Sequence, residues 1–433
     1  MSTKHRVKLQ HKPDLVNLAR LFPEKFPALL NSHIHNNKTG RFSILFAQSG
    51  QLIKASTLTE LSDLFTGFDK GIKASGEDDL PFNSGWFLYM GYASIMAWEH
   101  SLTEIKHDEN QPLAIAIRCQ SAIIIDHIKD ESWLVADSEA RVLELEKLLD
   151  KPIKHYRLTE NRLKVFADDV KAYIDNVKIA KDYIKSGDVY QVNLSRKWSL
   201  ESSRDIDVFS LYESLSRHNP APFAGLLQIP GFAVISSSPE RLIKVNNNTI
   251  ETRPIAGTRP RSDNKLEDQQ LIKELINHPK EQAEHIMLID LERNDLGRVS
   301  QTGSVKVDEF MVIESYAKVH HIVSNITGKL AGGTTFYDVI KASFPGGTIT
   351  GCPKIRCMQI IDELEKQPRG AYTGSMGYIT DDGRMDLNIL IRTFTLSEQE
   401  LSFHAGAGIV HDSIAENEAQ ESYYKAQALI NSL

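Results

Sequence analysis

The sequence predicts a mixed α+β protein built on large antiparallel sheets. Short apolar runs with the alternation typical of strands recur along the chain, and segments with a helical period of apolar residues lie between some of them. Strands and helices do not alternate regularly, as they would in a parallel sheet of β-α-β units. With 433 residues, of which 41% are hydrophobic, the chain has enough apolar material for a core of normal size.

Strand-like runs dominate the N-terminal region, which we assign to residues 1–155. They cover residues 41–47, 85–92, 113–118, 121–126 and 132–136. An acidic stretch at 137–161 follows and leads into the second region, residues 160–433. Because no Gly/Ser-rich or Pro-rich linker and no internal repeat divides the chain, the two regions are not expected to be separate modules.

The second region mixes helices, strands and glycine-marked motifs. Apolar residues recur at helical spacing from Val170 to Ile184, and Gly187 marks the end of that helix. We expect further helices at 265–294, 335–342, 353–364 and 415–431, and strands at 189–200, 231–239, 374–380, 387–396 and 401–410.

Charge and cysteine usage narrow the class of protein. A net charge of −7 argues against a nucleic-acid binder, which usually has a basic face. Three cysteines do not make a disulfide framework, and no Cys/His spacing indicates structural zinc. The N-terminus has no signal-peptide pattern, and the longest apolar run is too short to span a bilayer. We therefore predict a cytoplasmic protein.

Two acidic pairs are candidate metal ligands. Glu281 and Glu284 lie three residues apart in one predicted helix, and Glu418 and Glu421 lie three apart in another. This spacing places both carboxylates of a pair on one helical face, and Mg²⁺ commonly uses one or two carboxylates. For either pair alone, solvated surface glutamates are the simpler interpretation, and Lys425 could form an ordinary i,i+4 ion pair with Glu421.

Other polar residues also lie where chemistry could occur. Glu240 follows an apolar strand and a serine-rich turn, so it could act as a general acid or be an exposed turn residue. The run "SFPGGTITGCPKIR", with Thr348, presents backbone N–H groups before a helix, either as a carboxylate cradle or as an ordinary glycine turn. Arg392 is a charge flanked by apolar residues and needs an anion or a salt-bridge partner.

The motifs, taken together in their order, resemble the chorismate-utilising enzymes. The resemblance rests on nine runs that cover most of residues 165–430: "GDVYQVNLSR", "SSPERL", "TRPIAGTRPR", "EHIMLIDLERNDLGRV", "VHHIVSNI", "FPGGTITGCPK", "RGAYTGSMGY", "MDLNILIRT" and "AGAGIVHDS". It implies one interleaved fold in which two large, mostly antiparallel sheets pack face to face, with helices outside. The N-terminal "FPALLNS" and "GRFSILFA" resemble the front half of component I of anthranilate or aminodeoxychorismate synthase.

The resemblance also implies roles for individual residues. Glu240 matches the family's general acid, and the two acidic pairs match the ligands of a Mg²⁺ ion beside the C1 carboxylate of chorismate. Ser32, in "LLNS", lies where anthranilate synthases read "LLES" and bind tryptophan, so it is a candidate for such a site. Substrate contacts are expected at His321, Thr348, Tyr372, Arg392, Gly406, Gly408 and Lys425.

Gln191 predicts that the nucleophile is ammonia. Family members that use water have a lysine at this position as a general base, because water is a poor nucleophile. Ammonia carries a free lone pair and needs no such base. The sequence shows no cysteine-nucleophile glutaminase region, so we expect a separate glutamine amidotransferase subunit to supply the ammonia.

Ala256 bears on which carbon is aminated. Aminodeoxychorismate synthases usually have a lysine in "PIKGT" that adds covalently at C2, whereas this chain reads "PIAGT", as anthranilate synthases do. The runs "VYQVNLS", "SFPGGTITGCPK", "GSMGYI" and "MDLNILIRT" nevertheless resemble the para-aminobenzoate branch. The sequence therefore predicts amination at C4, as by component I of aminodeoxychorismate synthase, in a variant without the lysine nucleophile. The alternatives are component I of anthranilate synthase and, less favoured, a degenerate regulator that binds chorismate or tryptophan.

Overall fold

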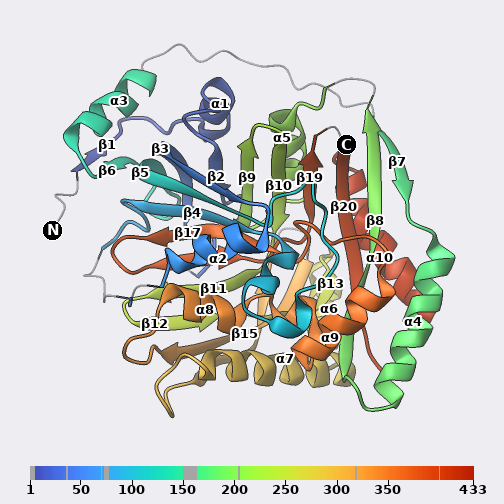
Figure 1. Cartoon of the computed structure of the whole chain (residues 1–433). Helices are drawn as coiled ribbons and strands as arrows, with labels where there is room; N and C mark the ends of the chain where they lie inside the picture. Colours follow the sequence, from blue (N-terminus) through green and yellow to red (C-terminus); the bar gives the residue numbers. More distant parts are fainter. Residues whose placement is uncertain are drawn as a thin grey trace.

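A computed structural model describes residues 5–35, 38–69, 71–72, 78–149, 163–202, 205–316, 319–398 and 400–433. Its strands form one hydrogen-bonded network in which all the pairings are antiparallel. The network branches at the long strand β5 (Ala114–Asp126). One edge of β5 pairs with β3 along its length, while β4 and β6 share the other edge. Two arms leave this branch point, and helices lie outside them (Figure 1).

The first arm contains the strands that run up the view in Figure 1. Beyond β5 it continues through β3, β2, β9, β10, β19 and β20 to β8, and it ends with β7 and β16 on the far edge of β8. The bounds are β3 (Phe42–Ala55), β2 (Ala28–Asn31), β9 (Phe223–Ile229), β10 (Phe232–Ser238), β19 (Thr393–Ser397), β20 (Glu400–Ile409), β8 (Gln191–Ser202), β7 (Leu163–Ala167) and β16 (Gly351–Cys352).

The second arm runs from β4 through β17, β18, β11 and β12 to β15, which also pairs with β13 and β14. Strands β6 and β1 extend the other half of the β5 edge. The bounds are β4 (Gly85–Met90), β17 (Ser375–Thr380), β18 (Met385–Asn388), β11 (Arg241–Asn246), β12 (Thr249–Thr252), β15 (Val319–Lys329), β13 (Ile255–Pro260), β14 (Lys306–Ser315), β6 (Glu131–Ala136) and β1 (His5–Lys8).

A shared apolar core shows that the arms pack face to face. The ring of Phe46 in β3 lies 5.4 Å from that of Phe87 in β4, and Tyr89 in β4 lies 5.4 Å from Phe232 in β10. All four side chains are buried in one cluster that both arms supply. The predicted pair of packed sheets is therefore present as two arms of a single network.

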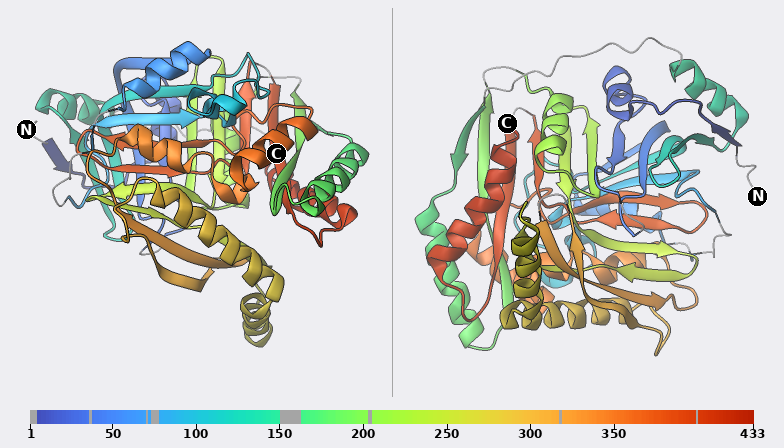
Figure 2. Two further views of the ribbon diagram at one scale, coloured as in Figure 1. Left: turned by 60° about the horizontal axis from the view of Figure 1, so that its bottom comes forward. Right: turned by 180° about the vertical axis from the view of Figure 1, so that it is seen from behind.

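The helices cover the outer faces. The helices α1 and α5 pack with the first arm, α3 packs against β6 and β1, and α10 lies along β20 beside α4, at the right of Figure 1. The helices α6 and α7 lie along the edge formed by β13 and β15, which Figure 2 shows from two further sides. The bounds are α1 (Leu15–Leu21), α2 (Leu58–Thr66), α3 (Glu139–Leu149), α4 (Val170–Lys185), α5 (Val208–His218), α6 (Lys265–Asn277), α7 (Pro279–Gly297), α8 (Phe336–Ser343), α9 (Lys354–Leu364) and α10 (Ala415–Ile430), with short 3₁₀ turns η1 (Tyr92–Ala97), η2 (His100–Leu102) and η3 (Gly347–Ile349).

Strand pairing shows how the N-terminal residues enter the fold. From the first 155 residues, β2 pairs with β9 and β4 pairs with β17. These strands therefore share sheets with residues more than 190 positions further along the chain. None of the described helices is long and apolar enough to cross a membrane.

The structure differs from the predicted elements in four places. The single helix predicted at 265–294 is two helices, because Pro279 has no N–H to continue the first one and instead opens α7. The strand predicted at 387–396 is interrupted between β18 and β19, where Arg392 adopts a φ of +53°. The runs at 113–118 and 121–126 form one strand, β5, and the described part of the acidic stretch contains α3.

Candidate active site

Glu240 occupies the turn between β10 and β11 and is 6% exposed. The Thr348 hydroxyl donates to its Oε1 at 2.9 Å, and the backbone N–H of Ile255 also donates to the carboxylate. Burial raises the pKa of Glu240 to about 7, and these two hydrogen bonds offset part of that rise. A buried carboxyl group with this pKa is suited to general acid catalysis near neutral pH.

The turn that carries Thr348 is held close to α7. A Cβ atom on Gly347 would lie 2.2 Å from Leu291 Cδ2, so a larger residue there would require the Leu291 side chain to move. The turn then enters β16, and α9 begins only at Lys354. Thr350 turns back to donate to the carbonyl of Gly346 at 2.9 Å. Of the two threonines, Thr348 is the one that bonds to Glu240, the candidate general acid.

The segment around Ala256 lies between Glu240, the candidate general acid, and the first acidic pair. Ile255 donates to Glu240, whereas Gly257, at a φ of +59°, lies so close to α7 that an added Cβ would be 2.9 Å from Glu281 Oε2. Ala256 is buried between them, next to a bulge in β13. Ala256, which replaces the lysine that aminodeoxychorismate synthases usually carry, is therefore enclosed within the candidate site.

Each acidic pair spans the first two turns of its helix, Glu281 and Glu284 on α7 and Glu418 and Glu421 on α10. Gln191 Nε2 donates to Glu284 Oε1 at 3.3 Å, while Glu281 pairs with Arg259 at 3.3 Å. Burial raises the pKa of Glu284 and repulsion from Glu281 adds to it; burial raises the pKa of Glu418 as well. The charge of Lys425 on α10 lowers the pKa of Glu284, and the charge of Lys280 on α7 lowers the pKa of Glu418. These cross-effects indicate that the N-terminal turns of the two helices face each other.

The donor chemistry fits a hard divalent cation that takes part of its coordination from water and substrate. Glu418 is 7% exposed, and no cation pairs with Glu284 or Glu418 in the described part of the chain. Burial is the main cause of the raised pKa of both carboxyls, and the charges of Lys280 and Lys425 offset part of it. Within the described ranges no three His, Cys, Asp or Glu side chains converge into a complete metal site, so protein groups alone do not form a cage.

His321 and Arg392 form a second part of the site. The His321 ring nitrogen Nδ1 lies 2.9 Å from the Thr258 hydroxyl, and burial, followed by the charge of Arg392, lowers the pKa of His321 to about 4. Arg392 Nη1 donates to Asn219 Oδ1 at 3.1 Å. In the described residues no carboxylate pairs with Arg392, and burial lowers its pKa. The salt-bridge alternative therefore has no partner here, which leaves the guanidinium available to an anionic ligand.

Strand β20, α10 and the segment before β17 supply the remaining predicted contacts. Lys425 Nζ donates to the carbonyl of Gly406 at 3.0 Å and pairs with Glu421 at 2.8 Å. Gly408 lies next to the Gln191 side chain, and a Cβ atom added at Gly408 would be 2.3 Å from Gln191 Nε2. Tyr372 is buried and its ring stacks on that of His404 at 5.4 Å.

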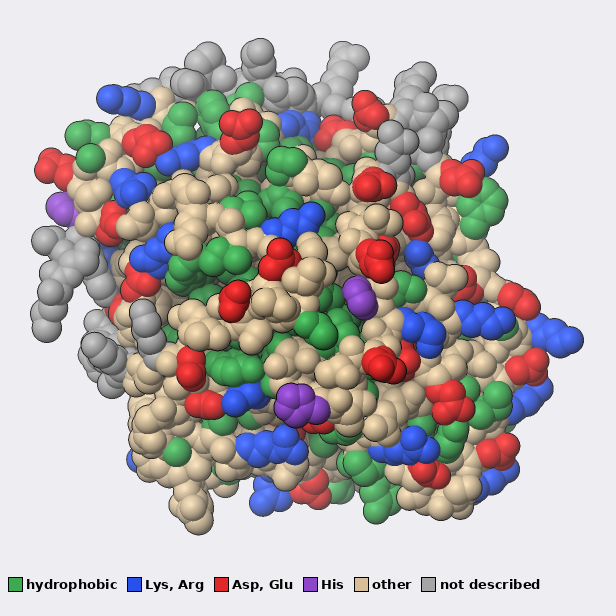
Figure 3. Space-filling model, viewed as in Figure 1, with side chains coloured by type: hydrophobic (Ala, Val, Ile, Leu, Met, Phe, Trp, Pro, Cys, Tyr) green, Lys and Arg blue, Asp and Glu red, His purple; other side chains and the backbone are tan. Residues whose placement is uncertain are grey.

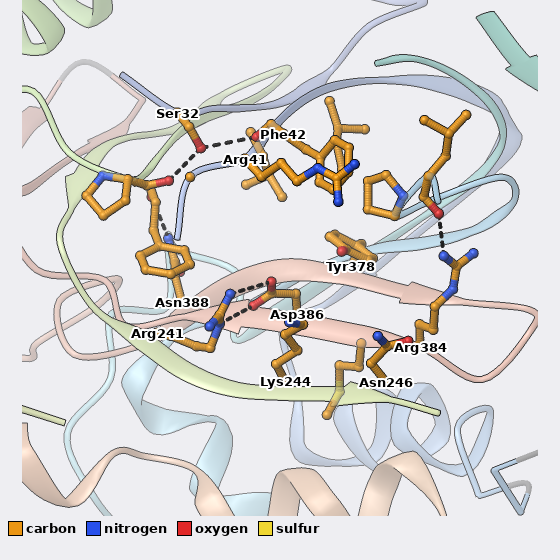
Figure 4. A pocket seen from close by; sticks show the side chains of 18 of the residues that line it. Ser32, Arg41, Phe42, Arg241, Lys244, Asn246, Tyr378, Arg384, Asp386 and Asn388 are labelled. Carbon is orange, nitrogen blue, oxygen red and sulfur yellow. Dashed lines mark hydrogen bonds and ion pairs between the residues drawn. The ribbon is translucent and has the colours of Figure 1, made fainter. Parts of the chain in front are cut away.

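Ser32 lies in a different cavity, of about 270 Å³, which contains none of the other predicted site residues. Its hydroxyl donates to the carbonyls of Pro222 at 2.6 Å and Phe42 at 3.1 Å. Figure 4 shows Arg41, Arg241, Lys244, Arg384 and Asp386 around the same space. Ser32 is thus separate from the catalytic candidates, and tryptophan binding at this cavity stays a prediction.

Sequence reasoning missed a buried carboxyl group beside Glu240. Glu292 is 4% exposed on α7, and Lys354 Nζ pairs with Asp295 at 2.6 Å one turn further on. Burial raises the pKa of Glu292, with the charges of Asp295 and Glu240 adding to it. The spacing of the residues could have indicated this burial, because one stripe of the helix contains Glu284, Leu288, Glu292 and Asp295. The sequence "LERND" by itself is typical of a solvent-exposed helix face.

The family model of the chorismate binding enzymes matches residues 31–431. With this fold and this set of side chains, the chain belongs to that family of enzymes.

Curated relatives carry two different names. The chain is 42% identical over 359 residues to an anthranilate synthase component I-like protein of Synechocystis sp., which covers 82% of this chain and 74% of that protein. It is also 42% identical over 325 residues to aminodeoxychorismate synthase component 1 of Bacillus subtilis, with 72% and 68% covered. Their equal identity does not decide between the two reactions.

Solved structures agree on the fold. Anthranilate synthase component I from Streptococcus pneumoniae superposes with a TM-score of 0.79 at 31% identity, covering 98% of this chain and 95% of that one. The menaquinone-specific isochorismate synthase from Escherichia coli gives a TM-score of 0.75 at 18% identity, with 100% and 94% covered. The predicted α+β fold of the chorismate-utilising enzymes is confirmed.

Proposed function

We propose that this chain is component I of aminodeoxychorismate synthase, a transferase that converts chorismate and ammonia into 4-amino-4-deoxychorismate for para-aminobenzoate and folate biosynthesis. The main support is that the site contains both a buried acid, Glu240, and a neutral amide, Gln191. Water-using relatives have a basic lysine at the position of Gln191. Amination requires a proton for the leaving hydroxyl but no base for the nucleophile. The identity of the aminated product tests the proposal.

Charges within the candidate site suit the two carboxylates of chorismate. Arg392 has no carboxylate partner among the described residues and would bind one of them. Mg²⁺, held by Glu281, Glu284, Glu418 and Glu421, would neutralise the other carboxylate as a Lewis acid. His321, neutral at physiological pH because its pKa is about 4, would contribute a hydrogen bond beside Arg392. Tyr372 and Lys425 would add further contacts along β20.

The metal assignment predicts that both acidic pairs control Mg²⁺ dependence. Glu284→Ala and Glu421→Ala should each raise the Mg²⁺ concentration needed for half-maximal activity, by about 10- to 100-fold or more, because each removes a carboxylate near the ion. Mg²⁺ titration of initial rates measures this. Glu416→Ala, at an exposed glutamate on the first turn of α10, is the matched control. Dependence on only one of the pairs would contradict a shared site.

The nitrogen source predicts dependence on a partner. Glutamine should support amination only when a glutamine amidotransferase subunit is added, whereas a high concentration of ammonium should bypass that subunit. Product formation from chorismate with each nitrogen source, with and without the subunit, measures the requirement. Efficient use of glutamine by the isolated chain would contradict it.

Ala256 requires a route to C4 without a lysine adduct. We propose that ammonia first attacks C2, so that the double bonds shift and the C4 hydroxyl leaves as water with the proton of Glu240. A second ammonia then attacks C4, the shift reverses, and the C2 group, which is still protonated as an ammonium, leaves as ammonia, while the ammonium formed at C4 returns a proton to Glu240. The small side chain of Ala256 leaves room for the noncovalent 2-amino intermediate.

This route predicts that synthetic 2-amino-2-deoxyisochorismate is a substrate. With ammonia supplied, the chain should convert it to 4-amino-4-deoxychorismate, and the protein mass should not change under turnover. Product analysis and intact-protein mass spectrometry provide the two measurements. A covalent adduct would contradict the route, and exclusive conversion of the compound to anthranilate would support the alternative.

Anthranilate synthase component I is the second candidate. One specific observation favours it, namely that the buried residue between Glu240 and Glu281 is the alanine that anthranilate synthases carry. It would use the same acid and the same proposed metal residues, place nitrogen at C2 and eliminate pyruvate. The two candidates therefore differ in their product and not in their predicted metal or ammonia requirement.

A further inference from the structure

The proposed mechanism leaves the buried carboxyl group of Glu292 without a task. The charge of Glu240 acts on Glu292, so the two buried groups are close enough to interact. Glu292 Oε1 would be 3.5 Å from a Cβ atom added at Gly347. This glycine directly precedes Thr348, whose hydroxyl bonds to Glu240 at 2.9 Å. Glu292 therefore lies beside the candidate acid and against the turn that holds it.

Hydrogen-bond directions indicate that Glu292 is protonated. Its carboxyl group is hydrogen-bonded to the Thr252 hydroxyl, and that hydroxyl also bonds to the carbonyl of Leu242 at 2.9 Å. A carbonyl can only accept, and a hydroxyl has a single hydrogen to donate, so the hydrogen of Thr252 is directed to Leu242. The Thr252 oxygen then accepts from Glu292, which requires a protonated carboxyl group.

An adjacent ion pair explains why Glu292 keeps its proton. Asp295 is three residues further along α7 on the same face, and Lys354 at the start of α9 pairs with it at 2.6 Å. Lys354 also donates to the carbonyl of Ser343 at 3.3 Å, which fixes the cation beside Asp295. A single lysine cannot balance two buried carboxylates. The carboxyl in direct contact with the lysine is therefore ionised, and the other one, Glu292, is neutral.

The charges around the two carboxyls of Glu292 and Glu240 agree with this assignment. Burial raises the pKa of Glu292, the charge of Asp295 adds to the rise, and Lys354 offsets part of it. Glu240 is the third charged neighbour that acts on Glu292. The pKa of Glu240 itself is set by burial and two hydrogen bonds, and no charged group in the described part of the chain contributes to it. A neutral Glu292 leaves the acid in this state.

We infer that Glu292 is a positioning residue for the general acid, and that Asp295 and Lys354 hold it neutral so that the acid can become an anion during turnover. When the O–H bond of Glu240 breaks and the C4 hydroxyl departs as water, a buried carboxylate is left. An ionised Glu292 would oppose that step, because a like charge nearby disfavours the carboxylate. Glu292 keeps its own proton throughout. This inference rests on the proposed function and adds a residue that controls its acid.

Moving the negative charge from Asp295 to Glu292 tests the inference. Asp295→Asn removes the carboxylate that holds Lys354, so Lys354 should pair with Glu292 and ionise it. The pH at which kcat falls, about 7 in the wild type, should then rise by about one unit, and kcat below that pH should decrease because Glu240 is a weaker acid. In the double variant Asp295→Asn/Glu292→Gln the fall should return to about pH 7, since an amide cannot ionise. All profiles are measured at one concentration of free ammonia.

Asp290→Asn is the matched control, because it makes the same change on the exposed face of α7, where Asp290 pairs with Arg293 at 2.9 Å. Its pH profile should match that of the wild type. A wild-type profile in Asp295→Asn, or a shift that the double variant retains, would overturn the inference, since the second substitution would not repair the loss of a merely structural contact.

Infrared spectroscopy tests the protonation of Glu292 without Asp295→Asn and without turnover. The difference between the spectra of the wild type and Glu292→Gln at neutral pH should contain the C=O stretch of a protonated carboxyl group. Carboxylate bands in its place would overturn the inference while leaving the proposed amination intact. Near-normal turnover of Glu240→Gln would instead remove the acid from the proposed function, and the role of Glu292 with it.

Discussion

Replacing Glu240 by glutamine should lower turnover by about 10²–10⁴-fold, the usual contribution of a general acid. The amide keeps the size of the side chain and can still bond to Thr348, but it cannot supply the proton that the leaving C4 hydroxyl needs. The KM for chorismate should therefore change much less than kcat. Steady-state kinetics at saturating Mg²⁺ and ammonium measure both values.

The pH profile gives a second readout of the same group. Burial raises the pKa of Glu240 to about 7, and the protonated form, which is the acid, predominates below that pH. At a fixed concentration of free ammonia, kcat should therefore fall as pH rises through about 7, and this limb should be absent from Glu240→Gln. Glu363→Gln, at an exposed glutamate bonded to Tyr183, should behave as wild type. Near-normal turnover of Glu240→Gln would remove Glu240 from its role.

Replacing Arg392 by glutamine should lower kcat/KM for chorismate by about 30- to 1,000-fold. The variant would leave a substrate carboxylate without its buried cation, and truncating one partner of such a pair costs about 2–4 kcal/mol. Arg392→Lys keeps the charge and should recover part of the loss. Initial rates at low chorismate concentration measure the effect.

Arg384→Gln is the control for losing a buried arginine. Arg384 pairs with Asp382 at 2.8 Å and lines the cavity near Ser32, away from the predicted catalytic residues. Its loss should lower the melting temperature without a comparable fall in kcat/KM. If Arg392→Gln retained kcat/KM within a few-fold of wild type, an anion-binding role for Arg392 would be contradicted.

Local sequence patterns predicted most helices and strands, because each pattern follows from one physical cause. The helical period after Val170 and the cap at Gly187 locate α4, and alternating apolar residues locate β8, β10 and β20. The errors arose where backbone chemistry overrode hydrophobic pattern. Pro279 ended one helix and began another, and the positive φ of Arg392 interrupted a run that reads as one strand.

Much of the site was predicted by motif resemblance, but its geometry was not. Ile255 and Gly257 connect Glu240 to Glu281 only because β13 bulges toward α7. Glu292 is buried, and Asn193 Oδ1 is buried without a hydrogen-bond partner, because of neighbours more than 50 residues away in the chain. No local sequence pattern could reveal either feature. Resemblance assigned Ser32 to a possible tryptophan site apart from the catalytic candidates, and the fold places it in a separate cavity.

The position of the new nitrogen tests the central proposal most directly. The chain is incubated with chorismate, Mg²⁺ and ammonium, and the products are identified before and after adding a lyase that removes pyruvate from 4-amino-4-deoxychorismate. We predict that 4-amino-4-deoxychorismate accumulates first and that para-aminobenzoate forms only after the lyase is added. Formation of anthranilate without the lyase would contradict C4 amination and identify the chain's reaction as that of anthranilate synthase component I.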